Sequence, residues 1–95
     1  MTASFPTGSL QDLLGKVVVV DVAPPVIYIG TLSAVDSAFI TLENADVHPL
    51  WNSSTSKEVY LMEARRNGVQ PTRRRVLVMR SEMLSISLLD DVVLY

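Results

Sequence analysis

The 95-residue chain contains no cysteine, which excludes disulfides, thiol nucleophiles and zinc or iron–sulfur sites held by thiolates. We expect neither a disulfide-stapled secreted domain nor any cofactor. Long hydrophobic runs are also lacking: the longest aliphatic blocks, Val17 to Val20 and Val76 to Met79, are far shorter than the roughly 20 residues that cross a bilayer. No apolar run before Lys16 resembles a signal peptide. These absences predict a cytoplasmic protein with no membrane partner.

Basic residues are scarce in the first half of the chain. Only Lys16 lies within the first 50 residues, whereas the other seven basic residues lie between Lys57 and Arg80. This uneven distribution can mark a surface for nucleic acid even though the net charge is −2. The composition, 48% hydrophobic and 19% charged, excludes global disorder. We expect residues 1–8 to form a flexible tail and residues 9–95 to form a single domain.

The first half of the chain shows one helical pattern and three strand patterns. A capping residue, Ser9, followed by leucines at helical spacing predicts a short helix over 9–14. Residues rich in valine and isoleucine then predict strands over 16–22, 26–35 and 39–44. Gly30 lies inside the second strand, where glycine indicates a bulge or a sharp bend.

The segment 46–72 is predicted to be an insertion between the third and fourth strands. Its first part, 46–56, has the composition of a loop, so we expect His48, the only histidine, to be solvated there. A capping box at Thr55 to Glu58 and the stop signal Asn67-Gly68 favour a helix between them. The apolar run 59–64 is too short for its period to exclude a strand.

Two further strands, over 75–79 and 83–88, flank a turn at 80–82. The sequence therefore predicts a mainly β fold with five short strands, a short N-terminal helix and a helical insertion. Five short strands, one of them bent at a glycine, suit a small barrel, because closure hides most of the sheet edges. Gly30 would then provide the bend.

Two motifs resemble those of the Sm/LSm family, the small barrels that form rings on RNA and include the bacterial chaperone Hfq. The first motif is matched by Gly30, Leu32 and Asp36, followed by the strand 40–42. The second motif is matched by the segment 79–82 before the strand 83–87. The resemblance covers roughly residues 9–93. It implies an Sm-like (SH3-like) five-stranded, strongly bent antiparallel barrel, a divergent member of bacterial type, and a homo-oligomeric ring.

The turn after Asp36 departs from the family pattern. RNA-binding members carry there a base-stacking side chain and an asparagine that hydrogen-bonds the base, whereas this chain reads Ser37-Ala38-Phe39-Ile40 and has no asparagine. Phe39 either stacks on a base or, as we favour, packs in the core. Asp36 either supports the RNA pocket or, again favoured, accepts hydrogen bonds from turn amides.

Arginine supplies the strongest functional signal. Arg80 lies in the second motif, and a guanidinium can stack on a base or hold phosphate. Arg73, Arg74 and Arg75 form a cluster that can attract phosphates without reading sequence. The alternative is that these three solubilise an exposed strand. The RNA-binding residues expected from the sequence are Arg80, Arg73, Arg74, Arg75, Asp36 and Phe39.

No pattern indicates catalysis or metal binding. The sequence has no phosphate-cradling glycine loop and no carboxylate pair at an informative spacing, and a serine nucleophile would have only His48 as its base. We therefore expect a protein that is not an enzyme.

Two functions remain open. The first is a ring that binds single-stranded RNA and in which the fourth and fifth strands pair between subunits. Apolar strands with unpaired edges favour aggregation, and pairing between subunits covers those edges. The second is a protein-interaction module with the same barrel and no RNA, whose partner binds the insertion at 46–72. The insertion could also block the ring interface and leave a monomer or dimer.

Overall fold

The computed structural model describes residues 10–23, 25–50 and 56–94. Its strands are β1 (Val17–Val22), β2 (Val26–Val35), β3 (Phe39–Pro49), β4 (Arg73–Met79) and β5 (Met83–Leu88). One α-helix, α2 (Lys57–Asn67), lies between β3 and β4, and the single-turn 3₁₀ helices η1 (Arg80–Glu82) and η2 (Leu89–Asp91) follow β4 and β5. The predicted tail at 1–8 lies outside the described residues.

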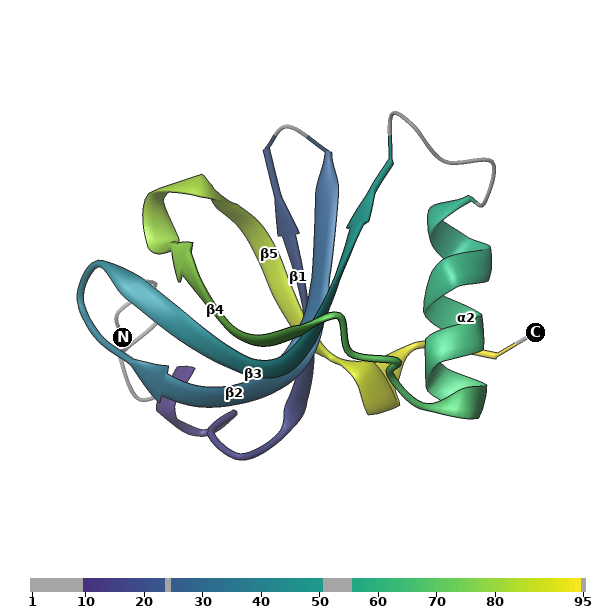
Figure 1. Cartoon of the computed structure of the whole chain (residues 1–95), viewed down its shortest axis with the longest axis horizontal. Helices are drawn as coiled ribbons and strands as arrows, with labels where there is room; N and C mark the ends of the chain where they lie inside the picture. The colour runs from purple at the N-terminus through teal and green to yellow at the C-terminus, as the bar shows by residue number, and fades with distance from the viewer. Residues whose placement is uncertain (1–9, 24, 51–55, 95) are drawn as a thin grey trace, which may run out of the picture.

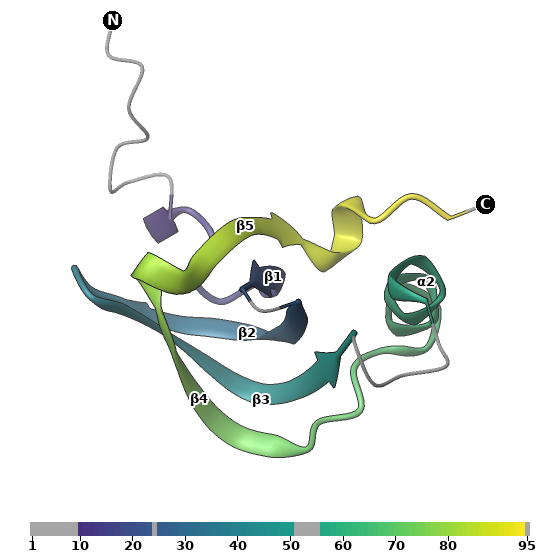
Figure 2. The same cartoon turned by 90° about the horizontal axis from the view of Figure 1, so that it is seen from above.

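The five strands form one antiparallel sheet in the order β4-β3-β2-β1-β5. The sheet curves strongly around itself (Figures 1 and 2). The prediction of a bent, five-stranded antiparallel barrel is confirmed. Because β4 and β5 end the strand order, each has one edge that pairs with no other described strand.

A β-bulge at Gly30 produces part of the curvature. Ile29 pairs with Asp46 and Thr31 pairs with Glu43, so two residues of β3 lie opposite Gly30 alone. One of these two, Asn44, has a positive φ of 51°. The bulge predicted from the glycine is therefore confirmed, and the extra residue belongs to the neighbouring strand.

Apolar side chains pack on both faces of the sheet. Val18 and Val20 point to one face, where they pack with Leu32, Ile40 and other residues of the barrel interior. Val19 points to the opposite face, which is covered by α2 and η2. Burial on both faces explains why β1 is a continuous valine run rather than an alternating strand.

The helix α2 is defined by its caps. The Ser56 hydroxyl accepts a hydrogen bond from the Val59 amide (3.2 Å), and the Gly68 amide donates to the Ala64 carbonyl (2.8 Å) with φ of 85° at Gly68. Leu61 and Ala64 are buried against the sheet. The helix expected between the capping box and Asn67 is thus confirmed, with its N-cap at Ser56 rather than at Thr55, the first residue of the predicted box.

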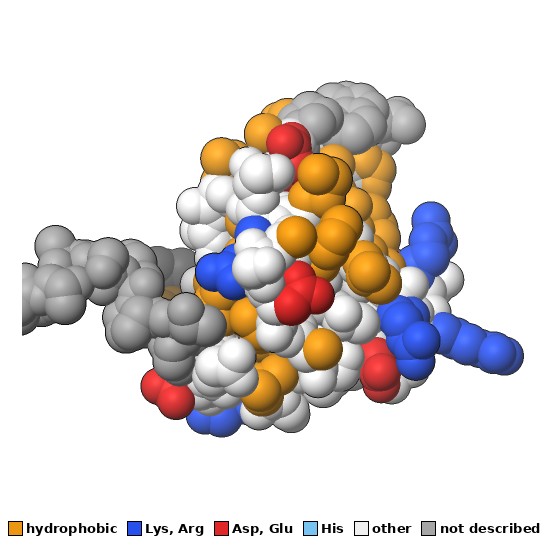
Figure 3. Space-filling model, turned by 90° about the vertical axis from the view of Figure 1, so that its left-hand side faces the viewer, with side chains coloured by type: hydrophobic (Ala, Val, Ile, Leu, Met, Phe, Trp, Pro, Cys, Tyr) orange, Lys and Arg blue, Asp and Glu red, His pale blue; other side chains and the backbone are white. Residues whose placement is uncertain are grey.

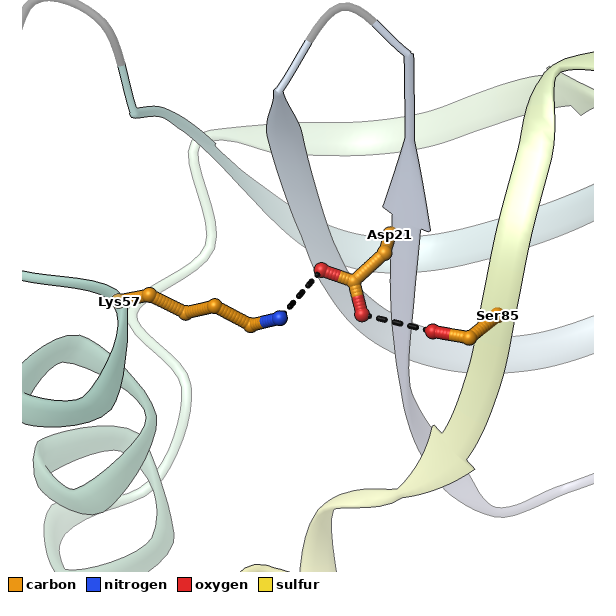
Figure 4. A network of polar contacts seen from close by, with 3 residues as sticks. All are labelled: Asp21, Lys57 and Ser85. Carbon is orange, nitrogen blue, oxygen red and sulfur yellow. Dashed lines mark hydrogen bonds and ion pairs between the residues drawn. The ribbon is translucent and has the colours of Figure 1, made fainter.

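A polar network ties the start of α2 to the barrel (Figure 4). The Asp21 carboxylate forms an ion pair with Lys57 Nζ (3.1 Å) and accepts a hydrogen bond from Ser85 Oγ (2.8 Å). These three residues come from β1, α2 and β5. The network therefore fixes the helix beside the last strand of the sheet.

Of the helix expected over 9–14, the described part consists of Leu10 and Gln11, which are helical and lead into a turn over 12–15. The amides of Leu13 and Leu14 bond to carbonyls three residues back, and so short a helix makes few bonds to offset its nucleation cost. Two predicted boundaries are wrong. β3 continues to Pro49 because residues 46–49 pair with β2. β4 begins at Arg73 because that residue pairs with Ala45.

The insertion is accordingly shorter than predicted and spans 50–72. Within the described part of the chain, no helix is long and apolar enough to span a bilayer.

Candidate nucleic-acid interface

Asp36 organises the turn between β2 and β3. Its Oδ1 accepts hydrogen bonds from the amides of Ala38 and Phe39, both at 2.8 Å, and its own amide donates to the Phe39 carbonyl (3.0 Å). The Phe39 and Ala38 amides hold the pKa of the Asp36 carboxyl below its usual value, with a smaller contribution from the charge of Arg80. The geometry therefore agrees with the interpretation that this carboxylate accepts turn amides.

Arg80 joins this turn to the connection between β4 and β5. Its guanidinium Nη1 donates to the Asp36 carbonyl (2.6 Å), and its amide donates to the Ala38 carbonyl (2.9 Å). A guanidinium has five N–H donors, so this side-chain bond positions the group while engaging one of them. The structure thus places together two residues that are 44 positions apart.

Phe39 begins β3 beside the same turn. It pairs with Met79 in the β3–β4 register, and its side chain is half-buried. It is absent from both buried apolar clusters. Phe39 is therefore neither a core residue, as we favoured from the sequence, nor fully exposed.

The triple arginine lies elsewhere. Arg73, Arg74 and Arg75 are exposed at the start of β4, near α2, whereas Arg80 follows the other end of that strand (Figure 1). Arg75 and Arg80 are five residues apart, and five residues of extended chain span about 17 Å. Arg75 Nη2 lies 3.7 Å from Glu43 Oε2, and Arg73 Nη1 donates to the Thr72 carbonyl (3.3 Å). The expected arginine face is thus divided into two separate groups.

An apolar groove that the sequence did not indicate runs beside Arg80. Leu13 and Leu10 form one wall, and residues 83–86 of β5 form the other. Leu84 in this groove is 71% exposed. The two leucines had suggested only an amphipathic helix, and nothing in the sequence places them opposite β5.

His48 lies in β3 rather than in a solvated loop, so that expectation is wrong. Its ring stacks on Tyr60 with centroids 3.9 Å apart, and its Nε2 is buried without a hydrogen-bond partner among the described residues. Tyr60 donates from its hydroxyl to Asp46 Oδ2 (2.7 Å). This cluster holds α2 against β3. Across residues 10–23, 25–50 and 56–94, no three side chains form a group suited to a metal ion.

No protein-family model and no curated protein matches the sequence. The fold, however, matches solved structures. An SmAP (LSm) protein from Methanococcus vannielii aligns with a TM-score of 0.60 and 19% identity over 93% of this chain and 100% of that one. An Sm protein of Pyrococcus abyssii in complex with a uridine heptamer aligns at 0.59 and 17% identity, over 90% and 99% of the two chains.

Two further matches differ in what they assemble with. A heptameric archaeal Sm protein aligns with a TM-score of 0.57 and 23% identity over 85% of this chain and 96% of that one. A chain of a NatC complex bound to CoA aligns at 0.57 and 20% identity, over 93% and 88%. At these identities the likeness establishes the fold alone. The resemblance seen in the sequence is confirmed as an Sm-like fold, and these matches give the bacterial-type expectation no support.

Proposed function

We propose that this protein assembles into a homo-oligomeric ring through β4 and β5 and binds single-stranded RNA at the turn formed by Asp36, Phe39 and Arg80. The observation that carries the proposal is the Arg80 guanidinium, which donates to the Asp36 carbonyl at 2.6 Å in the same turn that contains the partly exposed residue Phe39. A turn that provides an oriented cation and a partly exposed aromatic residue is suited to a phosphate and a stacked base. The cysteine-free chain fits the reducing cytoplasm.

The exposed sheet edges support assembly. Leu77 and Met79 on β4 are 56% and 52% exposed, and Leu84 on β5 is 71% exposed. Figure 3 shows many hydrophobic side chains on the face that carries the β2–β3 turn, with the largest group of basic side chains at one border. Pairing β4 of one copy with β5 of the next covers both edges, and repetition around an axis closes a ring.

The helix of the insertion leaves these edges accessible. The helix α2 packs on the sheet face formed by Val19, Ile27 and Ile29, at the end of the barrel opposite the β2–β3 turn (Figure 1). It therefore does not lie across β4 or β5 in the way that a monomeric or dimeric form would require. One protein with this fold is heptameric, which supports the ring in preference to a blocked interface.

The turn supports RNA binding of low sequence specificity. Ser37 and Ala38 provide no amide side chain to read a base edge. Contacts to phosphates and base faces supply affinity without sequence information. A structural neighbour binds uridine RNA, and we expect this protein to bind U-rich and A-rich strands with similar affinity.

The test is a fluorescence-anisotropy titration of labelled U-rich, A-rich and mixed RNAs at several salt concentrations. Arg80→Ala should weaken binding about tenfold or more and make the salt dependence shallower, because several copies each lose a phosphate contact. Lys16→Ala, which removes an exposed cation that forms no bond with the turn residues 36–39 in the described part of the chain, is the matched control. Equal affinity of the wild type and Arg80→Ala would exclude this site, and no binding at low salt would exclude the RNA function.

The second candidate function is a protein-interaction module with no RNA. It is supported by the fold match to a chain of the NatC complex and by α2, whose outer side carries the exposed residues Val59 and Glu63. Absence of RNA binding, together with a partner whose recovery depends on Val59 and Glu63, would favour this function over the first.

A further inference from the structure

The two sheet edges end in opposite charges. β4 begins with three exposed arginines, Arg73 to Arg75. β5 is followed directly by η2, in which Asp90 and Asp91 are exposed. Each charged group thus lies at one end of a strand whose outer edge pairs with no described strand.

Both charged ends lie at the same end of the barrel. The start of β4 follows the segment that leaves α2, and η2 is held to α2 by a hydrogen bond from Arg65 Nε to the Asp90 carbonyl (3.2 Å). The other ends of β4 and β5 meet at η1 (Figures 1 and 2). Along the barrel, β4 therefore runs away from α2 and β5 returns toward it.

In a ring with cyclic symmetry, the basic end of β4 and the acidic end of β5 come together between neighbouring copies. In a closed ring every copy presents the same end to the same side. When β4 of one copy lies beside β5 of the next, the strands are antiparallel, like every strand pair within the chain. The arginines at the start of β4 then face the acidic pair of the next copy.

The charges within one copy leave this contact available. The two ion pairs in the described part of the chain are Lys57–Asp21 and Arg75–Glu43. Asp90 and Asp91 therefore take part in neither pair. The Arg73 guanidinium donates a hydrogen bond to the Thr72 carbonyl, which carries no charge. Of the three arginines, Arg73 and Arg74 are the ones without an ion pair among the described residues.

We propose that Arg73 and Arg74 of one copy pair with Asp90 and Asp91 of the next, and that these pairs fix the direction and register of β4 against β5. The proposal rests on the ring assembly inferred above and assigns these arginines to the subunit interface rather than to RNA. Apolar edge strands alone specify register weakly, because a shift by two residues keeps the same faces in contact. Opposite charges at one end of the pair penalise such a shift.

Charge reversal tests the contact. The oligomer of the wild type is compared by sedimentation velocity with Arg73→Glu/Arg74→Glu, Asp90→Lys/Asp91→Lys and the quadruple variant. Each double variant should raise the dissociation constant of the oligomer about tenfold or more at low salt, and the quadruple variant should restore assembly. Glu63→Lys, an exposed charge reversal on α2 outside both edge strands, is the control. Circular dichroism verifies that each variant is folded.

The outcomes separate this proposal from the assembly itself. A monomeric wild type would exclude the ring and this contact with it. A wild-type oligomer that both double variants leave intact, or that the quadruple variant does not restore, would exclude the charge pairing while retaining the ring. Full assembly of Arg73→Glu/Arg74→Glu with loss of RNA affinity would assign the arginines to RNA.

Discussion

At the scale of single residues, Gly30 is required for space rather than for backbone conformation. A Cβ built at this position would lie 2.9 Å from the Ala45 Cβ and 3.1 Å from its Cα. The two strands approach this closely at the bulge, where β3 contains the extra residue. The sequence indicated the bulge, but it could not show that Ala45 is the neighbour that fills the space.

We predict that Gly30→Ala destabilises the protein by about 1–3 kcal/mol, since overpacking a close backbone contact costs about that much. Thermal unfolding followed by circular dichroism should show a lower melting temperature. Adding Ala45→Gly removes the clashing Cβ and should recover part of the loss. An unchanged melting temperature for Gly30→Ala would contradict the close approach.

Asp36 and Arg80 show what residue patterns do and do not reveal about the site. Both were predicted from the motifs, because an aspartate and an arginine occur there at the family spacing. The sequence did not indicate that Arg80 donates to the backbone carbonyl of Asp36, because that bond depends on how two separate turns meet in space. For the same reason it could not separate Arg80 from the triple arginine along β4.

At the scale of elements, the sequence predicted strand ends best where a turn pattern bounds the strand, as residues 36–38 do after β2 and residues 80–82 do before β5. The boundaries of β2 and β5 agree with the prediction. The end of β3 was missed because its last residues, among them His48 and Pro49, have loop-like composition but pair with β2. Tertiary pairing here overrides local preference.

The attachment of α2 to β3 depends on Tyr60, whose hydroxyl donates to Asp46 at 2.7 Å. Burial, and then the hydrogen bond to Asp46, raise the pKa of Tyr60 above its ordinary value of 10.0. A raised pKa means that the folded state favours the protonated phenol. Its contribution to stability is thus fully present below pH 10 and is lost as the pH rises toward the folded-state pKa.

We predict that Tyr60→Phe lowers the free energy of unfolding by about 1 kcal/mol at neutral pH, because one hydrogen bond is lost. Above pH 10 the wild type should lose stability more steeply than this variant. Urea denaturation at neutral and alkaline pH measures both effects. Tyr28→Phe is the control, because the Tyr28 hydroxyl has no hydrogen bond in the described part of the chain. Parallel pH profiles for wild type and Tyr60→Phe would contradict the assignment.

At the scale of the whole molecule, the strand order leaves β4 and β5 as outer edges with exposed leucine and methionine side chains. Apolar residues on an unpaired edge favour association with another strand. The sequence predicted both strands as apolar, but which strands form the edges follows from the sheet order. That order requires the pairing of β5 with β1, a contact between distant segments.

We predict that Leu84→Lys weakens assembly at least about tenfold, because it places a charge on the apolar edge. The fold of each copy should be retained, since Leu84 is 71% exposed in the single chain. Sedimentation velocity gives the oligomer mass, and circular dichroism gives the fold. Val93→Lys, at a position 62% exposed outside the strands, should assemble normally. Normal assembly of Leu84→Lys would place the interface elsewhere.

The three residues of η1 connect the two edge strands and include Arg80. A ligand held by Arg80 therefore acts on the segment that sets the positions of β4 and β5 relative to each other. If the proposed ring binds RNA more tightly than the single copy does, thermodynamic reciprocity requires RNA to strengthen the ring by the same factor. The fraction of protein bound to RNA and the size of the assembly then both depend on the same coupling free energy.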